Sequence, residues 1–104
     1  MTSQALIDAV EAVCPATYEL AAPPGLNRYV VWHEYNREPI HADDHRVLQL
    51  PKLQLDLCWQ ASGDTLLDDV SGVLDELYLP YELQDIFYDP DYERERAIIQ
   101  VTVV

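Results

Sequence analysis

The sequence is poor in basic residues and in glycine. Its 104 residues contain six Lys or Arg against 19 Asp or Glu, which gives a formal net charge of −13 at pH 7. Binding to nucleic-acid phosphates depends on basic charge, so this balance argues against nucleic-acid recognition and against anionic membranes. The three glycines form no phosphate-binding loop, which argues against nucleotide chemistry of that type.

Cysteines and long apolar runs are also scarce. Cys14 and Cys58 have neither a CxxC arrangement nor metal-ligand spacing, so we expect two reduced, partly buried thiols, with a single disulfide as the alternative. No apolar stretch approaches the ~20 residues that a membrane-spanning helix needs. The start, residues 1–4, lacks a basic segment followed by an apolar run, so we expect no signal peptide and a cytosolic site of synthesis.

What the chain does contain is a high share of apolar and aromatic residues. A hydrophobic fraction of 49% and an aromatic fraction of 10% argue against disorder. The length predicts one domain, residues 1–104, with one modest core. Eight aromatic side chains are too many for that core, and we expect some at a subunit interface: Tyr29, Trp32, Tyr35, Tyr78, Tyr81, Phe87, Tyr88 and Tyr92.

Two stretches have the spacing of amphipathic helices. Residues 3–13 place an apolar stripe on one side, with Thr2 or Ser3 as the cap and Pro15 after the end. Residues 65–78 repeat the pattern, and Pro80 blocks continuation. The stripe of this second helix consists of Leu66, Val70, Val73 and Leu77, widened by Leu67 and Leu74.

Five stretches read as strands. They cover residues 17–20, 29–35, 47–59, 81–88 and 96–104, and the last two form a candidate hairpin around residues 89–91. Residues 53–59 alternate apolar and polar side chains, so we expect one face of that strand to be buried and the other to be exposed to solvent. Near Pro51 the apolar residues change from even-numbered to odd-numbered positions, which predicts one bent strand or two short strands meeting there. Residues 36–45 read as a polar loop.

The element order predicts an α+β fold. We expect the order α-β-β-β-α-β-β, with an antiparallel sheet of four to five strands and both helices packed on one face.

Candidate chemistry is weak throughout the chain. His41 and His45 are four residues apart, but they fall in the expected loop with no third ligand fixed by sequence, so we expect no metal site. The acidic pairs fall on polar helix faces and in turns, where carboxylates are solvated and not tuned for acid–base work. We therefore expect no enzyme, no catalytic residues and no cofactor.

The mixed charge run from Glu93 to Arg96 has two interpretations. It is either a soluble hairpin edge that discourages strand addition, or a docking patch for an assembly partner.

The order of these segments resembles the small tail-completion proteins of long-tailed bacteriophages and prophages, the tail terminators and tail-to-head joining proteins. The likeness lies in the helix at residues 5–10, the Pro-rich link and aromatic strand at 23–31, and the loop at 42–44. It continues through the strand at 53–59, the helix-to-hairpin junction at 77–82 and the final strand at 98–104. It covers nearly the full length as a pattern, without a diagnostic motif.

The resemblance implies a structural virion protein that forms a ring, usually a hexamer, on the tail tube and connects it to the head. Its partners would be copies of itself, the tail tube protein and a head–tail connector or head-closure protein, with DNA only as passing cargo. The location would be the neck or tail end of the virion, after assembly in the host cytoplasm. The expected interface residues are Trp32, Arg37, His41, Asp43, Asp44, Tyr88, Arg94 and Arg96.

Two alternatives remain open. The chain could be another neck or minor tail protein, such as a head-closure protein. It could also be an acidic DNA mimic that inhibits a basic protein, although its acids are scattered over every segment.

Overall fold

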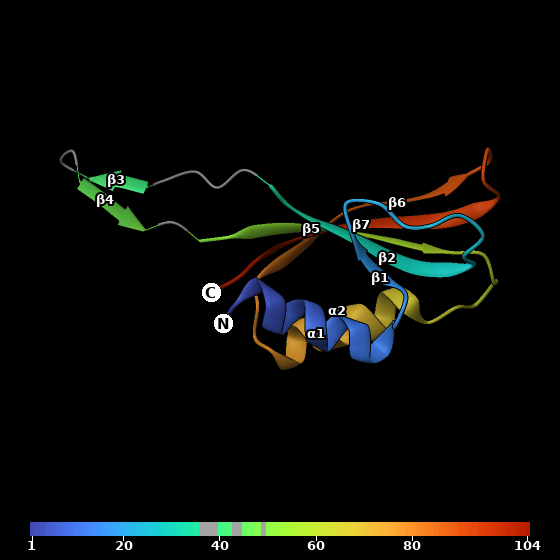
Figure 1. Cartoon of the computed structure of the whole chain (residues 1–104), viewed down its shortest axis with the longest axis horizontal. Helices are drawn as coiled ribbons and strands as arrows, with labels where there is room; N and C mark the ends of the chain where they lie inside the picture. The colour runs from blue at the N-terminus through green and yellow to red at the C-terminus, as the bar shows by residue number, and fades with distance from the viewer. Residues whose placement is uncertain (36–39, 43–44, 49) are drawn as a thin grey trace.

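The computed structural model describes residues 1–35, 40–42, 45–48 and 50–104. Two helices and seven strands follow one another along the chain (Figure 1): α1 (Ser3–Val13), β1 (Thr17–Glu19), β2 (Arg28–Tyr35), β3 (Ile40–Ala42), β4 (His45–Leu48), β5 (Lys52–Trp59), α2 (Leu66–Glu76), β6 (Tyr81–Asp89) and β7 (Arg94–Thr102). Five strands form one sheet in the order β1-β2-β5-β7-β6, and β3 pairs with β4 alone. Both helices lie on the same side of the five-stranded sheet (Figure 1).

The expected α+β class and the order of elements are confirmed. Strands β2, β5, β7 and β6 pair antiparallel, as expected. The short edge strand β1 instead pairs parallel to β2, which makes the sheet mixed. The Pro-rich link at residues 20–27 carries the chain back to the start of β2, so that both strands run the same way.

The core lies between the helices and one face of the sheet. The period-two pattern of β5 places Leu53, Leu55 and Leu57 on this face, fully buried. Register pairs them with Val101, Ile99 and Ala97 of β7. The helices close the core from the other side with Leu6, Ile7 and Val10 of α1 and Leu66, Val70 and Leu74 of α2.

The helix ends follow local chemistry. The hydroxyl of Thr2 accepts a hydrogen bond from the amide of Ala5 at 3.1 Å and caps α1. Helix α2 ends at Glu76 with Leu77 as its cap, and the next residue, Tyr78, has a φ of 55° in the left-handed region. There the amide of Leu79 donates to the carbonyl of Leu74 at 3.1 Å, which satisfies one of the last helix carbonyls.

Arg28 ties the two helices to the sheet. Its Nε donates to Asp64 Oδ1 at 3.1 Å and its Nη2 to Asp69 Oδ2 at 3.0 Å, so it holds the start of α2. Its Nη1 donates to the carbonyl of Val13 at the end of α1 at 3.2 Å. Asp64 is positioned by the chain itself, because its Oδ1 also accepts the amide of Leu66 at 2.9 Å.

Three sequence expectations are resolved here. The interruption near Pro51 is confirmed as a break between two strands, β4 and β5. The polar loop expected over residues 36–45 is wrong for 40–42 and 45, which belong to the β3–β4 hairpin. Residues 47 and 48 of β4 fall within the strand expected over 47–59, whereas β3 and the start of β4 were not predicted, because so few residues carry no clear period-two pattern. Cys14 and Cys58 are free and buried, as expected.

Replacing Arg28 should destabilise the fold. Arg28→Ala removes three hydrogen bonds to charged or helix-terminal groups and leaves the partly buried Asp64 without its cation. We expect the free energy of unfolding to fall by about 2 kcal/mol, measured by urea denaturation. Lys52→Ala removes the same charge from an exposed strand position and should change stability by less than about 0.5 kcal/mol. Equal losses for the two variants would contradict the role assigned to Arg28.

Candidate functional site

The sheet face opposite the helices, here called the outer face, carries a mixture of polar, aromatic and apolar side chains. No described helix covers it (Figure 1). Register places Tyr29, Cys58, Arg96 and Phe87 in one row across β2, β5, β7 and β6. The next rows combine apolar, amide and acidic groups, so the outer face is neither a second core nor a uniformly charged surface.

A pocket of about 420 Å³ lies at one end of the outer face and is called the Arg94 pocket. The guanidinium of Arg94 lies 5.5 Å from the ring centre of Tyr29 and 5.5 Å from that of Tyr92. Its Nη1 donates to the hydroxyl of Tyr29 at 2.8 Å and its Nε to the carbonyl of Tyr92 at 3.3 Å. The remaining wall is the Pro-rich link, so the lining consists of Ala22, Pro23, Pro24, Gly25, Tyr29, Tyr92, Arg94 and Arg96.

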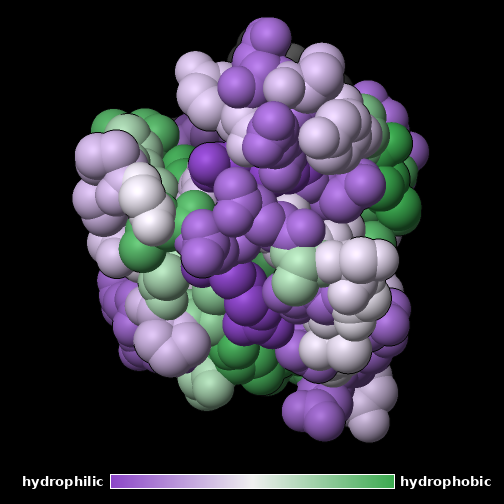
Figure 2. Space-filling model, turned by 90° about the vertical axis from the view of Figure 1, so that its right-hand side faces the viewer, coloured by the Kyte–Doolittle hydropathy of each residue, from purple (hydrophilic) through white to green (hydrophobic). Residues whose placement is uncertain are grey.

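Arg96 forms the floor next to Arg94. Its Nη1 donates to Asp89 Oδ2 at 3.5 Å, and its guanidinium lies 6.0 Å from the ring centre of Phe87. Asp89 also accepts the amide of Asp91 at 3.1 Å, so this carboxylate is fixed at the start of the β6–β7 turn. Figure 2 views the end of the molecule with this turn, and hydrophilic residues cover its middle while hydrophobic patches lie along its sides.

The environment of Tyr29 raises the pKa of its hydroxyl above the ordinary value of 10.0. Burial is the main cause, since it disfavours the phenolate, and a hydrogen bond with Cys58 acts in the same direction. Arg94 opposes the rise through its positive charge and its hydrogen bond. Tyr29 is therefore a neutral hydrogen-bonding group at physiological pH and serves as a support for Arg94.

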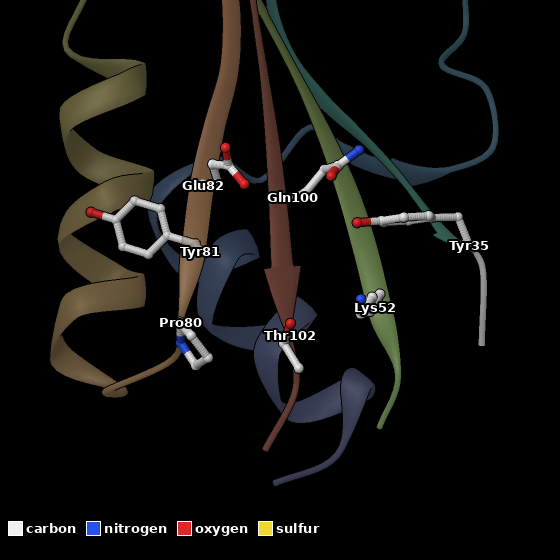
Figure 3. A pocket seen from close by; sticks show the side chains of 7 residues that line it. All are labelled: Tyr35, Lys52, Pro80, Tyr81, Glu82, Gln100 and Thr102. Atoms are coloured by element: carbon white, nitrogen blue, oxygen red, sulfur yellow. The ribbon is translucent and has the colours of Figure 1, made fainter. Parts of the chain in front are cut away.

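A second, smaller pocket of about 260 Å³ lies near the other end of the outer face (Figure 3). Its lining comprises Tyr35, Lys52, Pro80, Tyr81, Glu82, Gln100 and Thr102. Burial and then the charge of Glu82 raise the pKa of Tyr35. The ring of Tyr81 points away toward α2, where its hydroxyl donates to Asp75 Oδ1 at 3.0 Å (Figure 3). The pocket is thus shallow, mixed in polarity and bounded by one cation.

The free edge of the sheet at β6 is the least covered strand. All seven interior residues of its nine are exposed, and the apolar ones include Leu83 at 43%, Ile86 at 49%, Phe87 at 37% and Tyr88 at 54%. Register places Leu83 and Ile86 on the helix side of the sheet, beyond the cover of the helices. The strand is kinked by a bulge between Leu83 and Asp85.

The described side chains, residues 1–35 and 50–104, give little support to metal or thiol chemistry. No three His, Cys, Asp or Glu within them come together as metal ligands. Burial raises the pKa of the Cys14 thiol, which makes it a poor nucleophile. The arrangement offers stacking surfaces, guanidinium donors and an open strand edge, which are features that bind other molecules.

The predicted interface residues fall in three places. Arg94 and Arg96 come together at the Arg94 pocket. Tyr88 is on the exposed edge strand β6, whereas Trp32 is half-buried on the helix side and packs against the core. Arg37, Asp43, Asp44 and the side chain of His41 lie outside the described residues, as does the side chain of His45.

The charge run from Glu93 to Arg96 does not lie at a sheet edge. Strand β7 is paired on both sides, with β5 and with β6, so the interpretation as a soluble hairpin edge is wrong. The alternation of β7 sends Arg94 and Arg96 to the outer face and Glu95 to the helix side, where it pairs in register with Trp59. The docking interpretation stays a prediction.

Sequence reasoning missed the partners that build the pocket. Tyr29 and Tyr92 were only two aromatics among eight, and residues 23–25 were only a connection. Their approach to Arg94 depends on tertiary contacts 65 residues apart in the chain, for which a single sequence carries no local signal.

Comparison with protein-family models, with curated proteins and with solved structures finds no match to this chain. Among the described residues, no helix is both long and apolar enough to cross a membrane. The function therefore has to be argued from the geometry above.

The raised pKa of Tyr29 should make the fold sensitive to alkali. Because the folded pKa lies above the unfolded value of about 10, the stabilisation from neutral Tyr29 is fully present below that pH and is lost as pH rises through the folded pKa. We expect Tyr29→Phe to reduce the loss in unfolding free energy between pH 9 and pH 11, measured by urea denaturation. Tyr88→Phe, at an exposed site, is the control. A Tyr29 midpoint at or below 10 in ultraviolet difference titration would contradict this account.

Proposed function

We propose that this chain is a structural assembly protein and not an enzyme. The observation that carries the proposal is the open edge of β6, which presents apolar side chains to solvent along a full-length strand. An uncovered edge exposes unpaired backbone donors and acceptors and invites pairing with another chain. A partner that covers β6 would bury both its backbone edge and side chains such as Ile86.

The charge of β6 argues for contact with a different surface and against self-pairing. Residues 81–89 contain Glu82, Asp85 and Asp89 and no basic residue. A two-fold dimer of β6 against β6 would bring these like charges together, which is unfavourable. Contact between one patch and a different patch on the next subunit builds a ring where the rotation closes and a filament where it does not, and the ring is the form that the resemblance implies. The proposed assembly is therefore ring-like.

The β3–β4 hairpin supplies a second reason to expect assembly. Figure 1 shows the two strands apart from the five-stranded sheet, and β3 pairs only with β4 among the described strands. A lone two-stranded hairpin is marginally stable in water. The surrounding sequence, residues 36–48, holds Arg37 and Arg46 but also Glu38, Asp43 and Asp44, so its formal net charge is −1 and charge does not select its partner. We propose pairing of this hairpin with a neighbouring β6 as the ring contact, because both leave a strand edge without a partner among the described strands.

The particular assembly that we propose is the neck or tail end of a long-tailed bacteriophage or prophage. Support comes from the resemblance in element order to tail terminators and tail-to-head joining proteins, together with the open edge and the arm-like hairpin. In this role a ring, usually a hexamer, would cap the tail tube and contact the head connector. A head-closure protein is the nearest alternative, and it would use the same kind of subunit contact.

A charge placed at an apolar position of the β6 edge should block assembly without unfolding the subunit. We expect Ile86→Glu to abolish ring formation on purified tail tubes, scored by negative-stain electron microscopy, because a buried carboxylate would lie in the contact. Gln84→Glu adds the same charge to the same strand, at an exposed position within the bulge, and should retain rings. Circular dichroism should show both variants folded.

Two outcomes would count against the proposal. Rings formed equally well by Ile86→Glu and the unmodified protein would remove the β6 edge from the contact. Failure of the unmodified protein to bind tail tubes or connector rings at all would remove the phage assignment, while leaving open assembly on another partner to be seen by light scattering.

A further inference from the structure

The Arg94 pocket concentrates positive charge within an acidic protein. The sequence has six basic residues, and the alternation of β7 places Arg94 and Arg96 on the same face two positions apart. Both line the pocket, and no carboxylate is among the lining residues. The nearest described carboxylate, Asp89, already accepts from Arg96 and from the amide of Asp91. Asp56 of β5 acts on Arg96 through its charge, and Asp91 and Glu93 flank Tyr92 in the exposed turn.

Arg94 is held in place yet keeps donor capacity. Its Nε and Nη1 are used by the carbonyl of Tyr92 and the hydroxyl of Tyr29, and stacking between these rings orients the guanidinium plane. Within the described part of the chain, Nη2 of Arg94 has no acceptor at hydrogen-bond distance. A guanidinium fixed in this way loses little further entropy when it binds a planar carboxylate.

The other walls fit a peptide better than a free anion. Pro23 and Pro24 are exposed and lack backbone N–H donors, and the ring of Tyr92 is 63% exposed. These apolar surfaces, in a pocket of about 420 Å³, leave room for a side chain beside the carboxylate. The net charge of −13 disfavours a free anion that gains only electrostatic contacts. A peptide adds apolar contact to the same carboxylate bond.

We propose that the Arg94 pocket binds an acidic peptide segment of a partner protein, with one carboxylate on Arg94 and a neighbouring apolar side chain against Pro23, Pro24 and Tyr92. This site lies on the outer face beside β6, and its argument does not rest on the contact proposed for the β6 edge. It gives the protein a second docking function in addition to ring formation, and it would hold even if the assembly were not a phage tail.

The test is a titration of the full chain, followed by two-dimensional NMR. The probe is a blocked pentapeptide with two aspartates around a leucine, and its twin has asparagine in place of each aspartate. We expect the aspartate peptide to shift the resonances of Gly25, Tyr92 and Arg94, and the twin to bind at least tenfold more weakly. Arg94→Gln should weaken binding at least tenfold, while Lys52→Gln, which removes the cation of the other pocket, should leave it unchanged.

A further variant keeps the test valid if Arg94→Gln disturbs the fold. Tyr92→Ala removes an exposed wall and should weaken binding at least threefold. Equal binding of the asparagine twin, or unchanged affinity in both pocket variants, would overturn the proposal. If inorganic phosphate shifts these resonances as much as the aspartate peptide does, the ligand is a free anion and the peptide proposal is overturned. If concentrating the protein alone shifts the same resonances, and Arg94→Gln abolishes these shifts, the occupant of the pocket is a second copy of this chain. That result also overturns the proposal.

Discussion

The burial of one sheet face under two short helices is the constraint on which the rest of the structure depends. Each helix has 11 residues, and together they cover the central strands through a continuous apolar contact with β5 and β7. They do not reach across β6, so apolar side chains such as Ile86 remain exposed on the same face. The core thus determines both what is stable in the isolated subunit and what is left for a partner.

The basic side chains are likewise divided between the inside of the fold and its outer face. Arg28 is used inside the fold, where it joins the start of α2 and the end of α1 to β2. Arg94 and Arg96 are used on the outer face, where aromatic rings orient them around a pocket. Most acids stay on the exposed sides, and the apolar core contains one buried polar residue, Thr17, among the described side chains. Non-specific contact between molecules this acidic is repulsive, so association would need specific patches.

Local pattern predicted the elements whose side chains alternate or recur over many residues. The alternation of Leu53, Leu55 and Leu57 predicted β5 and its buried face, and the helical spacing around Leu66 and Val70 predicted α2. The parallel pairing of β1 could not be predicted, because a three-residue strand carries no information about its direction. The pairing of β3 with β4 was not predicted either, because β3 is equally short. For the candidate site, the Glu93–Arg96 run drew attention to Arg94 and Arg96, which line the Arg94 pocket. The pocket itself required Tyr29, which reaches Arg94 only through the β2-β5-β7 order of the sheet.

The central claim is that the uncovered β6 edge is completed by another chain. Hydrogen exchange of the β6 amides, compared between the free subunit and subunits assembled on tail tubes, measures this directly. In the free subunit, about half of these amides point away from β7 and should exchange rapidly, because an edge strand pairs on one side only. The account predicts that the same amides become protected on assembly. Unchanged fast exchange of β6 in a fully assembled particle would contradict it.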